Sequence, residues 1–153
     1  MKEGLFKDVF PMLQKHYEKI NNLELLILKG HIITEHVIDI IIQSECGNRL
    51  NIKNQRFNFS DKLAILRILI PNIDHQRTYE SLKKFNDIRN KISHTLEFNT
   101  KEIDMYISIR FKDYKDLKKT KKNRTQALRA TIITVFVQLT AIYTMKFDEV
   151  SDN

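Results

Sequence analysis

The sequence predicts an all-α fold, an up-and-down bundle of four to five helices whose first helix is long. Helix-breaking residues are scarce, with three glycines and two prolines among 153 residues, and this scarcity favours long helices over a turn-rich sheet. Apolar residues recur at three- and four-residue steps over most of the chain, which is the period of one helix face. Hydrophobic residues make up 42% and charged residues 29%, a balance typical of globular proteins. We therefore expect one helical domain over residues 1–153, with a polar tail at 148–153.

The first predicted helix covers about residues 14–44, after a short apolar lead-in around Pro11. Its apolar stripe is wide enough to be buried on more than one side, against its own protein or against a partner. Gly47 and Asn48 are expected to end the helix, because both residue types adopt the left-handed conformation of a helix C-cap. The stripe consists of Ile20, Leu23, Leu26, Ile27, Ile33, Val37, Ile38 and Ile41.

Two further helices are predicted in the middle of the chain. One covers residues 61–70, with Ser60 as its N-cap and Asp61 in its first turn, and Pro71 stops it. The other begins near residues 76–78 and ends near residue 94. The apolar stripe of this second helix consists of Leu82, Phe85, Ile88 and Ile92.

The last third of the chain contains a short element and a long apolar helix. Residues 101–110 form the short element, and their alternating apolar residues are compatible with a strand. The last helix is expected over residues 124–146. Its stretch 130–145 carries no charge but is short for a membrane span, which needs roughly 20 apolar residues. We interpret it as a buried helix and expect no membrane partner.

The composition also bears on cofactors and location. Cys46 is the only cysteine, so an internal disulfide and a thiolate metal cluster are excluded, which fits a reducing compartment. Residues 1–8 lack an apolar signal region, and we expect a cytoplasmic protein. His31, Glu35 and His36 do not have the spacing that a catalytic zinc requires. We expect neither a metal nor another cofactor.

The formal charge of +7 and the pI near 9.5 favour phosphate polyanions such as RNA as partners. Much of the excess lies in a lysine-rich stretch over residues 112–124. This stretch either grips an RNA backbone or is a solvated surface loop, and both interpretations stay open. The candidate RNA contacts in it are Lys118, Lys119, Lys121 and Lys122.

The segment 85–94, Phe-Asn-Asp-Ile-Arg-Asn-Lys-Ile-Ser-His, carries the residues best suited to chemistry. Asn86, Asn90 and His94 are four residues apart and share one helix face. Arg89 lies about 100° around the helix from Asn90, and its permanent charge needs an acidic, phosphate or backbone partner. A purely structural interpretation also fits, because polar residues flank many amphipathic helices and a histidine near a helix C-terminus favours the helix dipole.

The segment 89–94, Arg-Asn-Lys-Ile-Ser-His, resembles the Arg-x(4-6)-His motif of the HEPN superfamily. In that family a polar residue, often Asn, commonly follows the Arg, as Asn90 does here. Residues 28–38 resemble the long first helix of small HEPN proteins, in which an acidic residue faces the motif. The resemblance implies a HEPN-like bundle. One position departs from a toxin group of the family, because Leu96 stands where that group has a tyrosine modified by a nucleotidyltransferase antitoxin.

The resemblance implies a metal-independent endoribonuclease that works as a homodimer. Two copies of His94 would flank one phosphodiester, one removing the proton from the ribose 2′-OH and the other protonating the leaving 5′-oxygen. Histidine suits both roles, because the pKa of this residue type, about 6.5, allows either form near neutral pH. Arg89 would stabilise the charge on phosphorus, and Asn90 would orient His94 or hold the phosphate. The product would be a 2′,3′-cyclic phosphate.

Further roles follow from the same resemblance. Glu35 would orient Arg89 or His94, Ser93 would support the motif, and Lys91 would bind RNA. The setting would be a toxin or a phage-defence component, with an antitoxin or another regulatory protein as a candidate partner. The alternative is a non-catalytic HEPN-like module that binds nucleic acid or regulates another protein.

Overall fold

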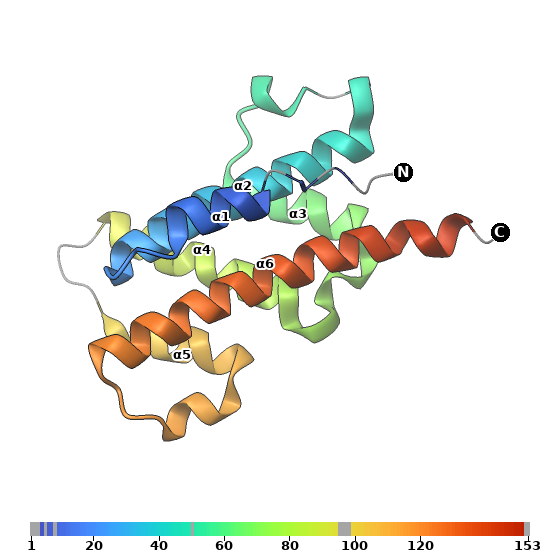
Figure 1. Cartoon of the computed structure of the whole chain (residues 1–153). Helices are drawn as coiled ribbons and strands as arrows, with labels where there is room; N and C mark the ends of the chain where they lie inside the picture. Colours follow the sequence, from blue (N-terminus) through green and yellow to red (C-terminus); the bar gives the residue numbers. More distant parts are fainter. Residues whose placement is uncertain (1–3, 5, 8, 50, 95–98, 152–153) are drawn as a thin grey trace.

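The computed structural model describes residues 4, 6–7, 9–49, 51–94 and 99–151. Across these residues the chain forms six α-helices joined by turns and four short 3₁₀ helices, without a strand (Figure 1). The all-α prediction is therefore confirmed for the described part of the chain. The α-helices are α1 (Val9–Tyr17), α2 (Leu23–Cys46), α3 (Phe59–Leu69), α4 (Thr78–His94), α5 (Thr100–Arg110) and α6 (Lys121–Ser151). The 3₁₀ helices are η1 (Gly47–Arg49), η2 (Ile52–Asn54), η3 (Pro71–Arg77) and η4 (Lys112–Asp116).

The prediction of one long first helix over residues 14–44 is wrong, because the chain turns between α1 and α2. The Asn22 side chain accepts a hydrogen bond from the Leu25 amide at 2.8 Å and so caps α2. The Ile20 amide closes the turn by donating a hydrogen bond to the Tyr17 carbonyl at 3.3 Å. The Ile20 side chain is buried. The long helix of the N-terminal half is therefore the second one.

The middle helices follow the predicted ranges, with one different cap. Asn58, not Ser60, caps α3. The Asn58 side chain accepts the Asp61 amide at 3.0 Å, and the Asp61 carboxylate accepts the Asn58 amide at 3.0 Å. This is a reciprocal capping box, and it confirms Asp61 in the first turn. Gly47 ends α2 as predicted, with a φ of 55° that suits a residue without a side chain.

The short element at 101–110 is a helix rather than a strand. The Asn99 side chain caps it by accepting the Lys101 amide at 3.0 Å. Ile103, Tyr106 and Ile107 are buried, which is the three- and four-residue spacing of a helix face. This helix and the N-terminal turn raise the number of α-helices above the four to five expected.

The last helix starts earlier and runs further than predicted. Thr120 accepts the Asn123 amide through its hydroxyl at 3.1 Å, so α6 begins at Lys121. The helix continues to Ser151, so residues 148–151 of the expected polar tail are helical. By length and composition alone, Lys121–Met145 is apolar enough to span a membrane, a test that the core helix of a soluble protein also passes. One side of it is buried, as predicted, through Leu128, Ile132, Val135, Phe136, Leu139 and Tyr143.

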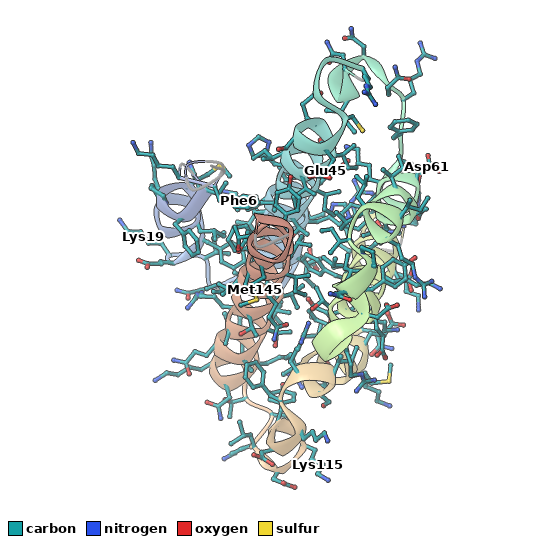
Figure 2. All side chains as sticks on the ribbon, turned by 90° about the vertical axis from the view of Figure 1, so that its right-hand side faces the viewer. Phe6, Lys19, Glu45, Asp61, Lys115 and Met145 are labelled. Carbon is teal, nitrogen blue, oxygen red and sulfur yellow. The ribbon has the colours of Figure 1, made fainter. Side chains whose placement is uncertain are left out.

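The helices pack in layers around α2 and α6 (Figures 1 and 2). Figure 2 shows α1 on one flank of this central pair and α3 with α4 on the other. Gly30 allows α2 to approach α1 and α6 closely, because a Cβ at this position would lie 2.8 Å from the Tyr17 hydroxyl and 3.1 Å from the Ile132 side chain. Phe85 of α4 stacks on Tyr106 of α5, with ring centroids 5.5 Å apart. Helix α4 runs antiparallel to α2, so its C-terminal end lies at the end of the bundle where α2 begins.

Candidate functional site

Helix α4 carries a polar ridge of Asn86, Asn90 and His94, and burial decreases along it. Asn86 is 7% exposed, Asn90 is half-buried, and His94 at the last position of the helix is exposed. The ridge therefore has a closed end inside the bundle and an open end at the surface.

At the closed end, Asn86 is bonded to a buried histidine of α2. Its Oδ1 lies 3.1 Å from Nε2 of His31, which is only 3% exposed. Since Oδ1 is an acceptor, Nε2 of the imidazole carries the proton. Burial lowers the pKa of His31, the bond to Asn86 opposes this effect, and the nearby charge of Arg89 lowers the pKa further. His31 is therefore a neutral hydrogen-bond donor with its ring 4.2 Å from that of Phe59.

Glu35 does not meet the motif but pairs with a lysine of α3. Lys62 Nζ donates to Glu35 at 2.8 Å and to Asp39 at 3.0 Å. Burial lowers the pKa of Lys62, but the two carboxylates outweigh this effect and raise it. Glu35 also lies 3.9 Å from Nδ1 of His31, which is beyond hydrogen-bond distance.

The pairing of Glu35 with Lys62 was not predicted from the sequence, although the sequence contains an indication of it. Glu35 and Asp39 stand four residues apart on one face of α2, and two neighbouring carboxylates repel each other unless a cation separates them. Lys62 supplies that cation from α3 and is buried in doing so.

At the open end, Arg89 and Asn90 hold each other. Nη1 of Arg89 donates to Oδ1 of Asn90 at 3.1 Å. Asn90 therefore holds the guanidinium of Arg89 in place and does not orient His94. Ser93 donates its hydroxyl to the Arg89 carbonyl at 3.0 Å. His94 is exposed and makes no hydrogen bond or ion pair with any described residue.

The lysines expected to bind RNA fall into three groups. Lys91 pairs with Glu102 of α5 at 2.5 Å. Lys119 donates to the Tyr114 carbonyl and lies 3.4 Å over the Tyr114 ring, while Lys118 is exposed. Lys121 and Lys122 sit in the first turn of α6 and line a hollow.

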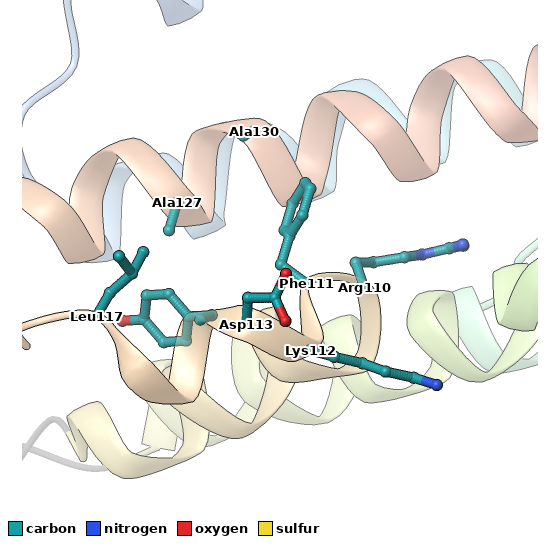
Figure 3. A pocket seen from close by; sticks show the side chains of 8 residues that line it. Arg110, Phe111, Lys112, Asp113, Leu117, Ala127 and Ala130 are labelled. Atoms are coloured by element: carbon teal, nitrogen blue, oxygen red, sulfur yellow. The ribbon is translucent and has the colours of Figure 1, made fainter.

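A second hollow, of about 630 Å³, lies between the end of α5, η4 and α6 (Figure 3). Its walls are largely apolar, with Leu117 and Ala127 facing each other across it. Asp113 contributes a carboxylate to the lining, so cations are not the only charges in it. The remaining lining residues are Arg110, Phe111, Lys112, Tyr114 and Ala130.

Within the described ranges, no three His, Cys, Asp or Glu side chains are grouped closely enough to hold a metal ion. Leu96, the position that departs from the HEPN toxin pattern, lies outside the described residues. The chain matches no protein-family model, no curated protein and no solved structure. The likeness to HEPN proteins therefore depends on the motif and on the helical character of the fold.

Proposed function

We propose that this protein is a metal-independent endoribonuclease of the HEPN type, a cytoplasmic toxin or phage-defence component whose active site forms between two copies of the chain. The observation that carries the proposal is the open end of the α4 ridge. There, the half-buried guanidinium of Arg89 is held by Asn90, and Asn90 stands one helical turn before an exposed histidine that has no partner in the described part of the chain.

The reaction requires two histidines on opposite sides of one phosphodiester. His94 of one copy takes the proton of the ribose 2′-OH, and the oxygen attacks phosphorus. His94 of the second copy donates a proton to the departing 5′-oxygen, leaving a 2′,3′-cyclic phosphate and a 5′-hydroxyl. Arg89 stabilises the extra negative charge on the phosphorane oxygens, which a guanidinium does well when its position is fixed in advance.

The exposed face of α2 supports the dimeric arrangement. Leu25 and Ile32 are seven residues apart, so they share one face of α2, and they are 40% and 66% exposed. Helix α2 packs directly against α4, as the bond between His31 and Asn86 shows. An apolar face beside the motif suits a two-fold contact that brings the two motifs together.

The experiment is an RNA cleavage assay in EDTA with single substitutions. His94→Ala and Arg89→Ala are expected to lower the rate by about 10²–10⁴-fold, the range of lost acid–base or electrostatic catalysis. The matched control is His16→Ala, because His16 is also an exposed histidine in the last turn of a helix, α1, and this variant is expected to cut like the wild type. Products are identified by their cyclic phosphate ends.

Two results would count against the proposal in different ways. Cleavage that survives His94→Ala would show that another residue performs the chemistry. Binding of RNA without cleavage by the wild type would favour the non-catalytic module, in which Arg89 and His94 contact nucleic acid but do not act on it.

A further inference from the structure

A hollow of about 510 Å³ lies where α6 begins. Its walls are two rows of α6 side chains, and within each row the residues are four positions apart. Asn21, in the connection between α1 and α2, closes one side of the hollow. The sequence indicated only its two lysines, through the lysine-rich stretch over residues 112–124. The lining residues are Asn21, Lys121, Lys122, Thr125, Gln126 and Arg129.

The charge in this hollow has one sign. Lys121, Lys122 and Arg129 are cations, no carboxylate belongs to the lining, and none of the three forms an ion pair with a described residue. Their neighbour Arg124 behaves differently, because it is held by Asp104 in a two-point contact of 2.8 and 2.9 Å. Cations that gather in a concave place without a carboxylate repel one another, and a bound anion removes that repulsion.

Arg129 is also held in place at the wall of the hollow. Its Nη2 donates to the Ile20 carbonyl at 2.5 Å, which fixes the guanidinium against the turn between α1 and α2. Its Nε is buried and has no hydrogen-bond partner in the part of the chain that the structure describes. A buried donor without an acceptor is unfavourable, and an anion in the hollow that Arg129 lines would offset the charge of its guanidinium.

Ion pairs between the helices place the hollow at the same end of the bundle as His94. Lys91 in the last turn of α4 pairs with Glu102 in the first turn of α5. Asp104, two residues further along α5, pairs with Arg124 near the start of α6. The C-terminal end of α4 and the N-terminal ends of α5 and α6 therefore meet, as the left side of Figure 1 shows.

We propose that this hollow binds a backbone phosphate of the RNA substrate, away from the phosphodiester that is cut. Lys121, Lys122 and Arg129 supply the charge, and the amides of Asn21 and Gln126 supply neutral donors. The choice of RNA as the source of the phosphate rests on the proposed ribonuclease function. The site positions the strand without reading its sequence, because phosphate contacts carry no sequence information.

The test measures binding separately from cleavage. A fluorescently labelled, fully 2′-O-methylated RNA lacks the attacking hydroxyl, so its affinity is read by anisotropy whether or not the protein is a nuclease. The Lys121→Gln/Lys122→Gln variant is expected to bind at least about 10-fold more weakly, with a smaller salt dependence by about 0.7 for each lost phosphate contact. The control Lys112→Gln/Lys115→Gln removes the same charge from η4, beyond the other end of α5, and is expected to bind almost like the wild type.

Each alternative result overturns the proposal. Equal losses in both double variants would show that only net charge matters. Unchanged affinity in the Lys121→Gln/Lys122→Gln variant would show that the hollow does not touch RNA. If inorganic phosphate bound to the wild type and not to this variant while RNA affinity stayed the same, the hollow would take a free phosphate instead. The ribonuclease proposal fails by a separate result, absence of cleavage of unmodified RNA, which leaves this binding comparison valid.

Discussion

The two ends of the α4 ridge use similar residues for opposite purposes. At Asn86 the amide is buried and bonded to His31, and nearby Lys62 pairs with both Glu35 and Asp39. At His94, two turns further along the same helix, the side chain is exposed and makes no hydrogen bond with the described residues. A buried polar group needs a hydrogen-bond partner, because leaving it unpaired costs folding free energy. His94 is exposed and can be hydrated, so the stability of the fold does not require a partner for it.

This difference separates stability from activity along a single helix. Substitutions at the closed end are expected to weaken the fold, and substitutions at the open end are expected to leave it intact. Arg89 links the two, because its charge reaches His31 while Asn90 holds its guanidinium at the open end. The open end is completed, in our proposal, by a second copy of the chain.

The largest expected effect tests whether a second copy of the chain completes the active site. Ile32→Asp should convert the dimer into a monomer and abolish cleavage. A two-fold contact carries each substitution twice, and losing the burial of two isoleucines costs about 3–6 kcal/mol. That loss weakens dimerisation by about 10²–10⁴-fold. Sedimentation at micromolar concentration measures the dimer, and the RNA assay measures the activity.

The control for this variant is Ile68→Asp on α3. Ile68 is 80% exposed, more than Ile32 at 66%, so the same substitution tests whether exposure alone is responsible. It should leave both the dimer and the activity unchanged. A wild-type protein that sediments only as a monomer, yet cuts RNA, would contradict the shared active site.

A smaller effect is expected at the closed end. Asn86→Ala leaves the Nε2–H of His31 buried without its acceptor, which should lower the free energy of unfolding by about 1–3 kcal/mol. Asn90→Ala at the half-buried position should change it by less than about 0.5 kcal/mol. Urea unfolding followed by circular dichroism measures both, and equal losses would show that the two ends of the ridge do not differ.

The double variant His31→Phe/Asn86→Leu sharpens this result. Replacing both partners of a buried hydrogen bond with apolar groups is often nearly neutral, whereas replacing one is not. The double variant should therefore lose less stability than the single variants His31→Phe and Asn86→Leu together. Additive losses would mean that the bond between His31 and Asn86 contributes little.

The sequence predicted well wherever a local pattern decides the structure. The range of α4, the end of α2 at Gly47 and the buried stripe of Leu82, Phe85 and Ile88 follow from periodicity and capping, which act over a few residues. The same locality explains two errors. Asn22 offers a cap inside an otherwise continuous apolar pattern, and the alternation over 101–110 overlaps with the helical spacing of Ile103 and Ile107.

The candidate site was harder to predict because it depends on which helices become neighbours. Sequence alone indicated Arg89, Asn90 and His94 as one segment, and α4 keeps them together. It did not indicate that Lys62 would take Glu35, because that pairing joins residues 27 positions apart on different helices. Arg129 was likewise invisible as a site residue, since its role depends on the carbonyl of Ile20, 109 positions away.

The smallest expected effect is a pH dependence of stability that belongs to the closed end. Burial lowers the pKa of folded His31, and Arg89 lowers it further against the opposing effects of Asn86 and Glu35. As the pH falls below about 6.5, the ordinary value for the residue type, the unfolded chain therefore takes up a proton before the folded chain does. Stability from this group is complete above that pH and is lost below it, with a slope of at most about 1.4 kcal/mol per pH unit.

Urea unfolding between pH 7.5 and 5.5 measures this slope in three proteins. The wild type should lose stability over the range, and the double variant His31→Phe/Asn86→Leu should lose less, because it no longer carries the buried imidazole. The control His36→Phe removes an exposed histidine from the same helix and should keep the wild-type slope. The carboxylate of Asp104 does not confuse the comparison: burial raises its pKa, but the hydrogen bonds from Arg124 and Tyr114 outweigh this and lower it, so the stability it contributes is lost only at more acidic pH. If the double variant and the wild type showed the same slope, His31 would titrate alike in the folded and unfolded states. The imidazole of His31 would then be more accessible to water than its 3% exposure indicates.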